Sequence, residues 1–195
     1  MNGWRAHLVS REVLPFYLSL LILGGGALLV DALLHLLHVV WIGRWLGIPG
    51  TLLIIGSFGY SLARRKWIKV AAPAGLLRLH ERMAWAGSLL ILVHAGVHFN
   101  ALLAWLAVWA MLINIASGLT GKFLMKRARA RLEETRTRLR AQGMSETALE
   151  ESLHWDSLTF DIVRRWRAVH YPVTLAFAVL ALAHILAVFW HWSWR

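Results

Sequence analysis

The sequence contains a stretch of 39 consecutive residues, positions 83–121, without a lysine, arginine, aspartate or glutamate. A helix needs about 20 apolar residues to cross the hydrocarbon core of a bilayer, so this stretch is barely sufficient for two crossings. The first of the two helices must therefore begin upstream, near residue 74, which places Arg78, His80 and Arg82 in its first turns. Because 58% of the chain is hydrophobic and only 16% is charged, the sequence predicts an integral membrane protein and not a soluble domain.

The predicted fold class is all-α, an integral membrane bundle of five transmembrane helices. These helices are expected at residues 14–41, 50–65, 74–100, 103–123 and 163–191. The chain from 1 to 195 is interpreted as a single membrane domain. Its only sizeable polar segment, at about 125–161, is expected to be a cytoplasmic helical loop. In that loop Gly143 is predicted to end a basic helix, and Ser145 to cap a short acidic one.

The distribution of positive charge predicts the orientation of the chain. Of 21 lysines and arginines, only Arg44 and Arg195 fall on the side of the predicted bundle opposite the N-terminus. The positive-inside rule then places the N-terminus in the cytoplasm and the C-terminus outside, in the inner (plasma) membrane of a cell. The net charge of +11 is accordingly interpreted as membrane topology and contact with membrane lipid, with no nucleic acid as partner.

Four histidines on two of the predicted helices have matching spacing. His80 and His94 are fourteen residues apart on the third helix, and His170 and His184 are fourteen apart on the fifth. Fourteen residues are nearly four helical turns, so each pair lies on almost the same face, about 21 Å apart along the axis. Both helices enter from the cytoplasmic side, so His80 meets His170 at one depth and His94 meets His184 at the other.

Two such pairs predict two b-type haems, each held by two imidazoles. The alternative is that these histidines make interhelical hydrogen bonds or lie at the membrane interface. The chain has no cysteine, which excludes protein-ligated iron–sulfur clusters, covalently attached haem and disulfides. Arg78, Arg82 and Arg167 are candidate partners for haem propionates near the inner pair, although positive-inside anchoring explains each equally well. His98 competes with His94 for the outer iron, or contacts a propionate or a quinone.

A second candidate site lies on the first predicted helix. Asp31 and His35 are four residues apart, and His38 follows one turn later. A carboxylate in lipid is expensive, which favours a functional role such as accepting protons from a quinol beside the outer haem. An interhelical salt bridge or hydrogen bond is the alternative.

The arrangement His80…His94 with His170…His184 resembles the dihaem b-type cytochromes. These include the cytochrome b subunit of quinol-oxidising bc complexes and the membrane domain of ferric reductases and NADPH oxidases. The resemblance covers about residues 74–191 and implies low-spin haems, each ligated by two histidines, that carry electrons across the membrane. The chain departs from the first group in having five predicted helices and no quinol-site loop motif. It departs from the second in having no flavin domain.

The function expected from these features is transmembrane electron transfer, as the membrane subunit of a quinone-linked oxidoreductase. One alternative is a stand-alone oxidoreductase that acts on ferric iron, oxygen or superoxide at the outer haem. Another is a non-redox metal permease or assembly factor. The basic residues 126–140 are expected to lie against anionic lipid, with docking of an acidic redox partner protein as the second interpretation.

Overall fold

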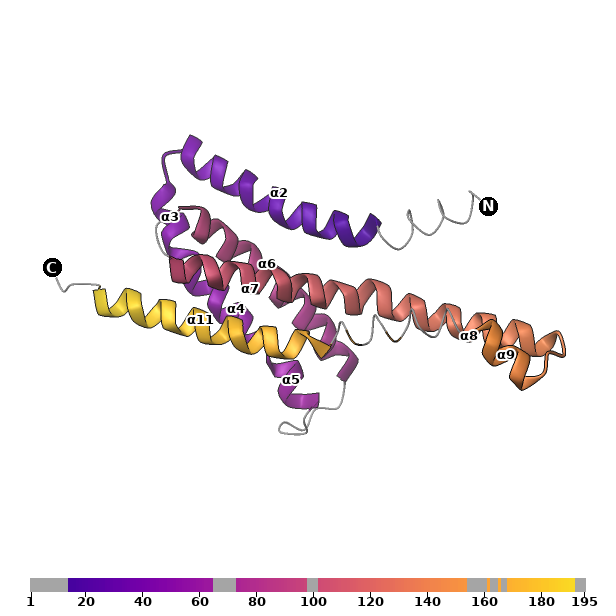
Figure 1. The fold of residues 1–195 in the computed structure, drawn as a ribbon. Coiled ribbons are helices and arrows are strands. Elements are labelled where there is room, and N and C mark those ends of the chain that lie inside the picture. The colour runs from indigo at the N-terminus through magenta and orange to yellow at the C-terminus, as the bar shows by residue number, and fades with distance from the viewer. Residues whose placement is uncertain are drawn as a thin grey trace. The chain divides into compact units, whose positions relative to one another are not determined.

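The computed structural model describes residues 14–64, 73–97, 102–153, 161, 165 and 168–191, and these residues form helices joined by short turns, with no strand (Figure 1). The all-α prediction is confirmed for this part of the chain. By contact, the chain divides into two compact units. One holds residues 1–20 and 112–176, and the other holds residues 21–111 and 177–195.

Among the described residues, four helical segments are long and apolar enough to cross a membrane. They are Leu14–Leu36, Val40–Ala63, Leu102–Phe123 and His170–His191. The prediction of a membrane protein is supported by this finding, whereas the orientation and the inner membrane stay predictions. The third predicted span is present as α6 (Pro73–Val97), a helix of 25 residues. It is not among the four because Arg78, Glu81 and Arg82 interrupt its apolar character, so the count of five spans also stays a prediction.

The first predicted helix, 14–41, is shorter than expected. Helix α2 (Leu14–Leu36) ends where His38 adopts a left-handed backbone conformation, with φ of 56°. The Val39 amide donates to the Leu34 carbonyl at 2.9 Å, and the His38 amide donates to the His35 carbonyl at 3.1 Å. These two bonds form a Schellman motif, which satisfies carbonyls that a helix end leaves unpaired. The chain then turns into the short helix α3 (Val40–Trp45).

The larger unit is organised around α6. Helices α4 (Gly47–Ser57) and α5 (Gly59–Arg64) follow α3 almost without interruption, and α4 makes the most extensive helix contact with α6. A Cβ atom added to Gly87 would lie 2.8 Å from the Gly50 carbonyl oxygen, so the two backbones are in close contact. Small residues permit such contacts between membrane helices, where packing replaces the hydrophobic effect as the source of stability. Nearby, Ala27 and Leu34 of α2 pack with Val93 of α6 in a buried cluster.

The chain after α6 forms one long helical rod and a folded-back hairpin. Helix α7 (Leu102–Leu119), the π-helical segment η2 (Thr120–Met125) and α8 (Lys126–Ala141) follow one another without a break. Gly143, with φ of 75°, ends the rod, and the Ser145 hydroxyl accepts a hydrogen bond from the Ala148 amide at the start of α9 (Glu146–Ser152). Both predicted helix signals in this segment are confirmed. The last described helix, α11, comprises His170–His191. The predicted start at residue 163 lies outside the described residues, although Arg165 and Ala168 are helical.

Candidate functional site

His80 is oriented by the end of a neighbouring helix. Its ring Nδ1 lies 2.9 Å from the carbonyl oxygen of Ser57, the last residue of α4. A carbonyl only accepts hydrogen bonds, so Nδ1 is the donor, and in the neutral ring Nε2 carries the lone pair. The Tyr60 ring lies beside the imidazole, with 5.8 Å between ring centroids. The geometry therefore presents Nε2 of His80 as the ligating nitrogen, since metal-bound histidines commonly donate their other N–H to a backbone carbonyl.

His94 repeats this arrangement at the other end of α6. Its Nδ1 lies 3.4 Å from the Gly43 carbonyl oxygen of α3, a long hydrogen bond. A Cβ atom added to Gly47 would be 2.9 Å from His94 Cδ2 and 3.0 Å from Nε2. The absence of a side chain at Gly47 is thus what allows the His94 ring to occupy this position.

His94 of α6 and His184 of α11 lie next to each other within the larger unit. Their ring centroids are 6.4 Å apart, and the ring planes are inclined by 62°. Two imidazoles on opposite sides of one metal ion have centroids roughly 6.3 Å apart, the sum of two metal–nitrogen bonds of about 2.0 Å and two ring radii of about 1.15 Å. A direct N–H···N hydrogen bond, at roughly 3 Å between nitrogens, brings the centroids to about 5.3 Å. The observed separation is that of an edge contact between two rings, and it is also close to the separation of two imidazoles that share one metal ion.

The inclination of the two rings is compatible with shared ligation. Each imidazole plane contains its own metal–nitrogen bond, so the two planes can rotate about a common axis without moving either nitrogen. An angle of 62° is one such rotation. His94 and His184 are thus residues of the kind that would hold the iron of a b-type haem.

His170 lies in the smaller unit, in a setting built by α7. A Cβ atom added to Gly118 would be 3.6 Å from His170 Cε1, so the ring and α7 are in van der Waals contact. One turn along α11, the Thr174 hydroxyl lies 2.8 Å from Asn114 Oδ1 of α7 and 2.6 Å from the His170 carbonyl oxygen. Ser117 is completely buried on the same part of α7. Polar side chains thus join the two helices at the level of His170.

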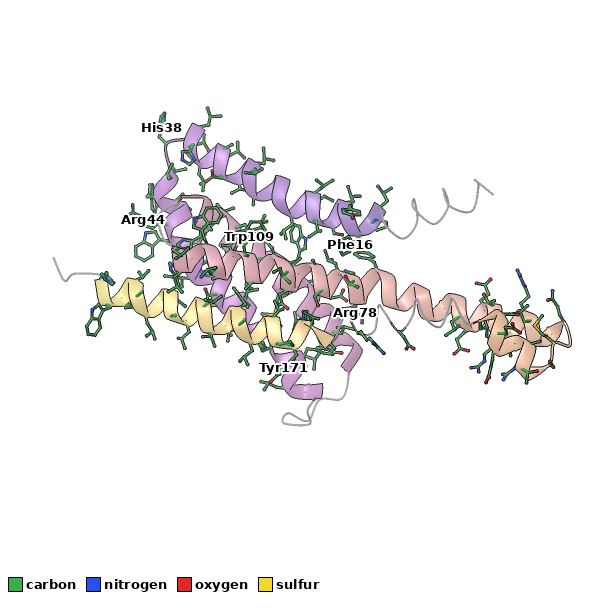
Figure 2. The ribbon with its side chains drawn as sticks, viewed as in Figure 1. Phe16, His38, Arg44, Arg78, Trp109 and Tyr171 are labelled. Carbon is green, nitrogen blue, oxygen red and sulfur yellow. The ribbon has the colours of Figure 1, made fainter. Side chains whose placement is uncertain are left out.

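Several predicted site residues stay predictions. His80 and His170 belong to different compact units, and their pairing stays a prediction. His98 and Arg167 lie outside the described residues. Arg78 (Figure 2) and Arg82 have exposed side chains near the start of α6. Both propionate binding and membrane anchoring require such exposure.

The Asp31 site is partly assembled. Asp31 Oδ2 lies 3.7 Å from His35 Nδ1, which is also 2.9 Å from the Asp31 carbonyl oxygen. Asp31 Oδ1 is buried without a hydrogen-bond partner in the described part of the chain, and a Cβ atom on Gly96 would be 3.4 Å from it. This carboxylate therefore lies against α6, two residues beyond His94. His38 is exposed at the corner after α2 (Figure 2), where its backbone conformation has a structural role.

Sequence reasoning missed the residues that orient the ring nitrogens. Gly47, expected to lie in a connection, is the first residue of α4 and contacts His94. The carbonyl groups of Gly43 and Ser57 carry no side-chain signal, so the sequence contains no indication of their role. No group of three or more histidine, aspartate or glutamate side chains that could hold a metal ion occurs among the described residues.

Comparison with known proteins finds no family model, curated protein or solved structure that matches this chain.

Proposed function

We propose that this protein transfers electrons across a membrane through two b-type haems, each held by one histidine of α6 and one of α11. The observation that carries the proposal is the 6.4 Å separation of the His94 and His184 rings. His94 and His184 would hold the outer haem, and His80 and His170 the inner one. A bound haem supplies one-electron redox chemistry at potentials set by its ligands and surroundings.

The protein's own groups prepare the outer ligand for this role. The Gly43 carbonyl holds the tautomer of His94 in which Nε2 binds a metal, and Gly47 admits the ring. A hydrogen bond to the other ring nitrogen also makes the imidazole a stronger ligand. The 2.9 Å hydrogen bond from His80 Nδ1 to the Ser57 carbonyl oxygen would fix the tautomer of the inner ligand in the same way.

Asp31 is the proposed proton acceptor for a quinol oxidised at the outer side. Its buried Oδ1 has no partner among the described residues, and a buried carboxylate gains stability when a donor approaches it. The quinone, a redox partner protein and the quinone-linked complex are parts of this proposal.

Haem content and single substitutions test the proposal. The purified protein should show a b-type α band in a reduced-minus-oxidised spectrum, with two haems per chain. His94→Leu and His184→Leu should each remove the same haem and leave the other. His191→Leu, a substitution of an exposed histidine at the end of α11, is the matched control and should retain both. A colourless protein would refute the proposal, and loss of different haems in the first two variants would refute the pairing.

A stand-alone oxidoreductase at the outer face would differ from a quinone-linked subunit in the electron acceptor of the outer haem. It predicts that ferric iron, oxygen or superoxide reacts with the reduced protein without a partner or quinone. Rapid mixing of the reduced protein with each oxidant separates the two functions. The metal permease interpretation predicts metal uptake by vesicles that contain the protein without haem.

A further inference from the structure

The rod formed by α7, η2 and α8 is longer than a bilayer needs. The apolar span on this rod ends at Phe123, and the helix continues to Ala141 in the same compact unit (Figure 1). At 1.5 Å per residue, Arg136 lies about 20 Å beyond Phe123 along the axis, and Arg140 lies about 26 Å beyond it.

These distances are too large for electrostatic contact with lipid headgroups. The polar layer on each side of a bilayer is about 5–8 Å thick. The screening length at physiological ionic strength is about 8 Å. A rod that continues along its own axis therefore carries its distal arginines out of reach of anionic lipid.

The apolar side of α8 is already covered. Helix α9 packs against α8, with Leu149 and Leu153 buried and with Leu132 and Leu139 of α8 half-buried. A helix that lies in the membrane interface needs an exposed apolar face to insert. In α8 the apolar residues pack against α9. Insertion of this face into lipid would therefore have to separate α9 from α8.

The surface that remains is strongly basic. Helix α8 contains seven lysines and arginines against two glutamates. The exposed side chains of its distal half include Arg136, Arg138 and Arg140. Arginine pairs with carboxylates through two parallel hydrogen bonds, which makes such a surface suited to an acidic protein.

We propose that the distal half of α8, residues 136–140, is a docking surface for an acidic protein partner, held away from the membrane by the rod. The expectation from sequence that the basic segment lies on anionic lipid is the alternative to this proposal. The inference does not depend on haem, so the haem content of each variant below shows independently whether the proposed function holds.

A spin label on α8 shows whether this surface lies in water, as docking of an acidic protein requires, or lies on anionic lipid. The chain has no cysteine, so Thr137→Cys gives a single labelling site on the exposed side of α8. In nanodiscs, the label should be equally accessible to a water-soluble relaxation agent in phosphatidylcholine and in mixtures with phosphatidylglycerol. Leu106→Cys, at an exposed position within the apolar span, is the control and should respond to oxygen dissolved in lipid. Shielding of the Thr137→Cys label in the anionic nanodiscs would overturn the proposal.

Binding of poly-glutamate tests whether this surface attracts an acidic polypeptide. The nanodisc-embedded protein should bind this peptide in a salt-dependent manner. The variant R136Q/R138Q/R140Q should bind about tenfold more weakly, since exposed ion pairs contribute about 0.5 kcal/mol each. E150Q/E151Q, which changes two exposed residues of α9, is the matched control and should bind at least as well as the native protein. Equal affinity of the triple variant and the native protein would overturn the proposal.

Discussion

At the scale of single residues, the orientation of two imidazoles depends on main-chain atoms far away in the sequence. His80 and His94 each direct Nδ1 to a carbonyl near a helix end, 23 and 51 residues away. The fourteen-residue spacing identified these histidines from the sequence. It could not identify Ser57 or Gly43, because a carbonyl acceptor is defined by how helices cross and not by the type of side chain.

The contact between Gly47 and His94 leads to a prediction for the variant Gly47→Ala. Its Cβ would be 2.9 Å from the His94 ring, so we expect the imidazole to move and the outer haem to be lost in at least half of the molecules. Gly59→Ala introduces the same methyl group where nothing lies within 4 Å. This control should keep its haem and gain about 0.5–1 kcal/mol of helix stability. Haem per chain, measured in both purified variants, checks the prediction, and equal content would contradict it.

His38 also has a testable role at this scale. A left-handed backbone costs a residue with a side chain about 1–2 kcal/mol, and glycine adopts it freely. His38→Gly should therefore stabilise the folded protein by about 0.5–1 kcal/mol after the larger unfolded-state entropy of glycine is subtracted. The midpoint of thermal unfolding in detergent checks this, with His38→Val as a destabilised comparison. Lower stability of the glycine variant would show that the imidazole makes contacts of its own.

At the scale of elements, the sequence predicted where helices exist better than where they end. Apolar length predicted α2, α7 and α11, and the length of the charge-free stretch correctly predicted a start of α6 near residue 74. The end of α2 was missed because its Schellman motif uses His38 in place of the usual glycine. The start of α4 at Gly47 was missed because two glycines and a proline suggested a loop, whereas packing on α6 stabilises a helix there.

The crossing of α4 and α6 yields a prediction about stability. Gly87→Ala would place a methyl group 2.8 Å from the Gly50 carbonyl oxygen and 3.0 Å from Ile54 Cγ1. Backbone atoms cannot move aside as flexible side chains can, so we expect destabilisation of about 1–3 kcal/mol. Gly75→Ala on the same helix, where nothing lies within 4 Å, should be neutral or stabilising. Thermal unfolding of the two variants in the same detergent makes the comparison, and equal midpoints would argue against a tight crossing.

At the scale of the whole molecule, most charges of the chain lie outside its apolar spans, which contain only Asp31, Arg44 and Lys122 among the charged residues. Composition alone predicted the membrane, because 58% of the residues are hydrophobic. The number of crossings is harder to predict because α6 combines 25 helical residues with charges near its start. Its polar end is compatible either with a crossing that begins at the cytoplasmic surface or with a helix shielded by its neighbours.

Cysteine labelling tests the predicted orientation. Arg44→Cys should react with a membrane-impermeant maleimide on intact cells, since the connection after the first span is predicted to lie outside. Thr147→Cys, at the exposed start of α9, should react only after the cells are lysed. The native chain, which has no cysteine, is the control for background. The reverse pattern would invert the topology, and labelling of both positions on intact cells would show that one of the predicted spans between them does not cross.

The π-helical turn at Thr120–Met125 has a consequence for how this protein varies among species. A π-turn closes each hydrogen-bonded ring with one residue more than an α-helix does. Loss of a single residue here would restore α-helical hydrogen bonding and leave the helices on either side intact. Homologous chains should therefore tolerate a one-residue gap within this turn, whereas the same gap within α6 would turn His80 and His94 to different sides of their helix.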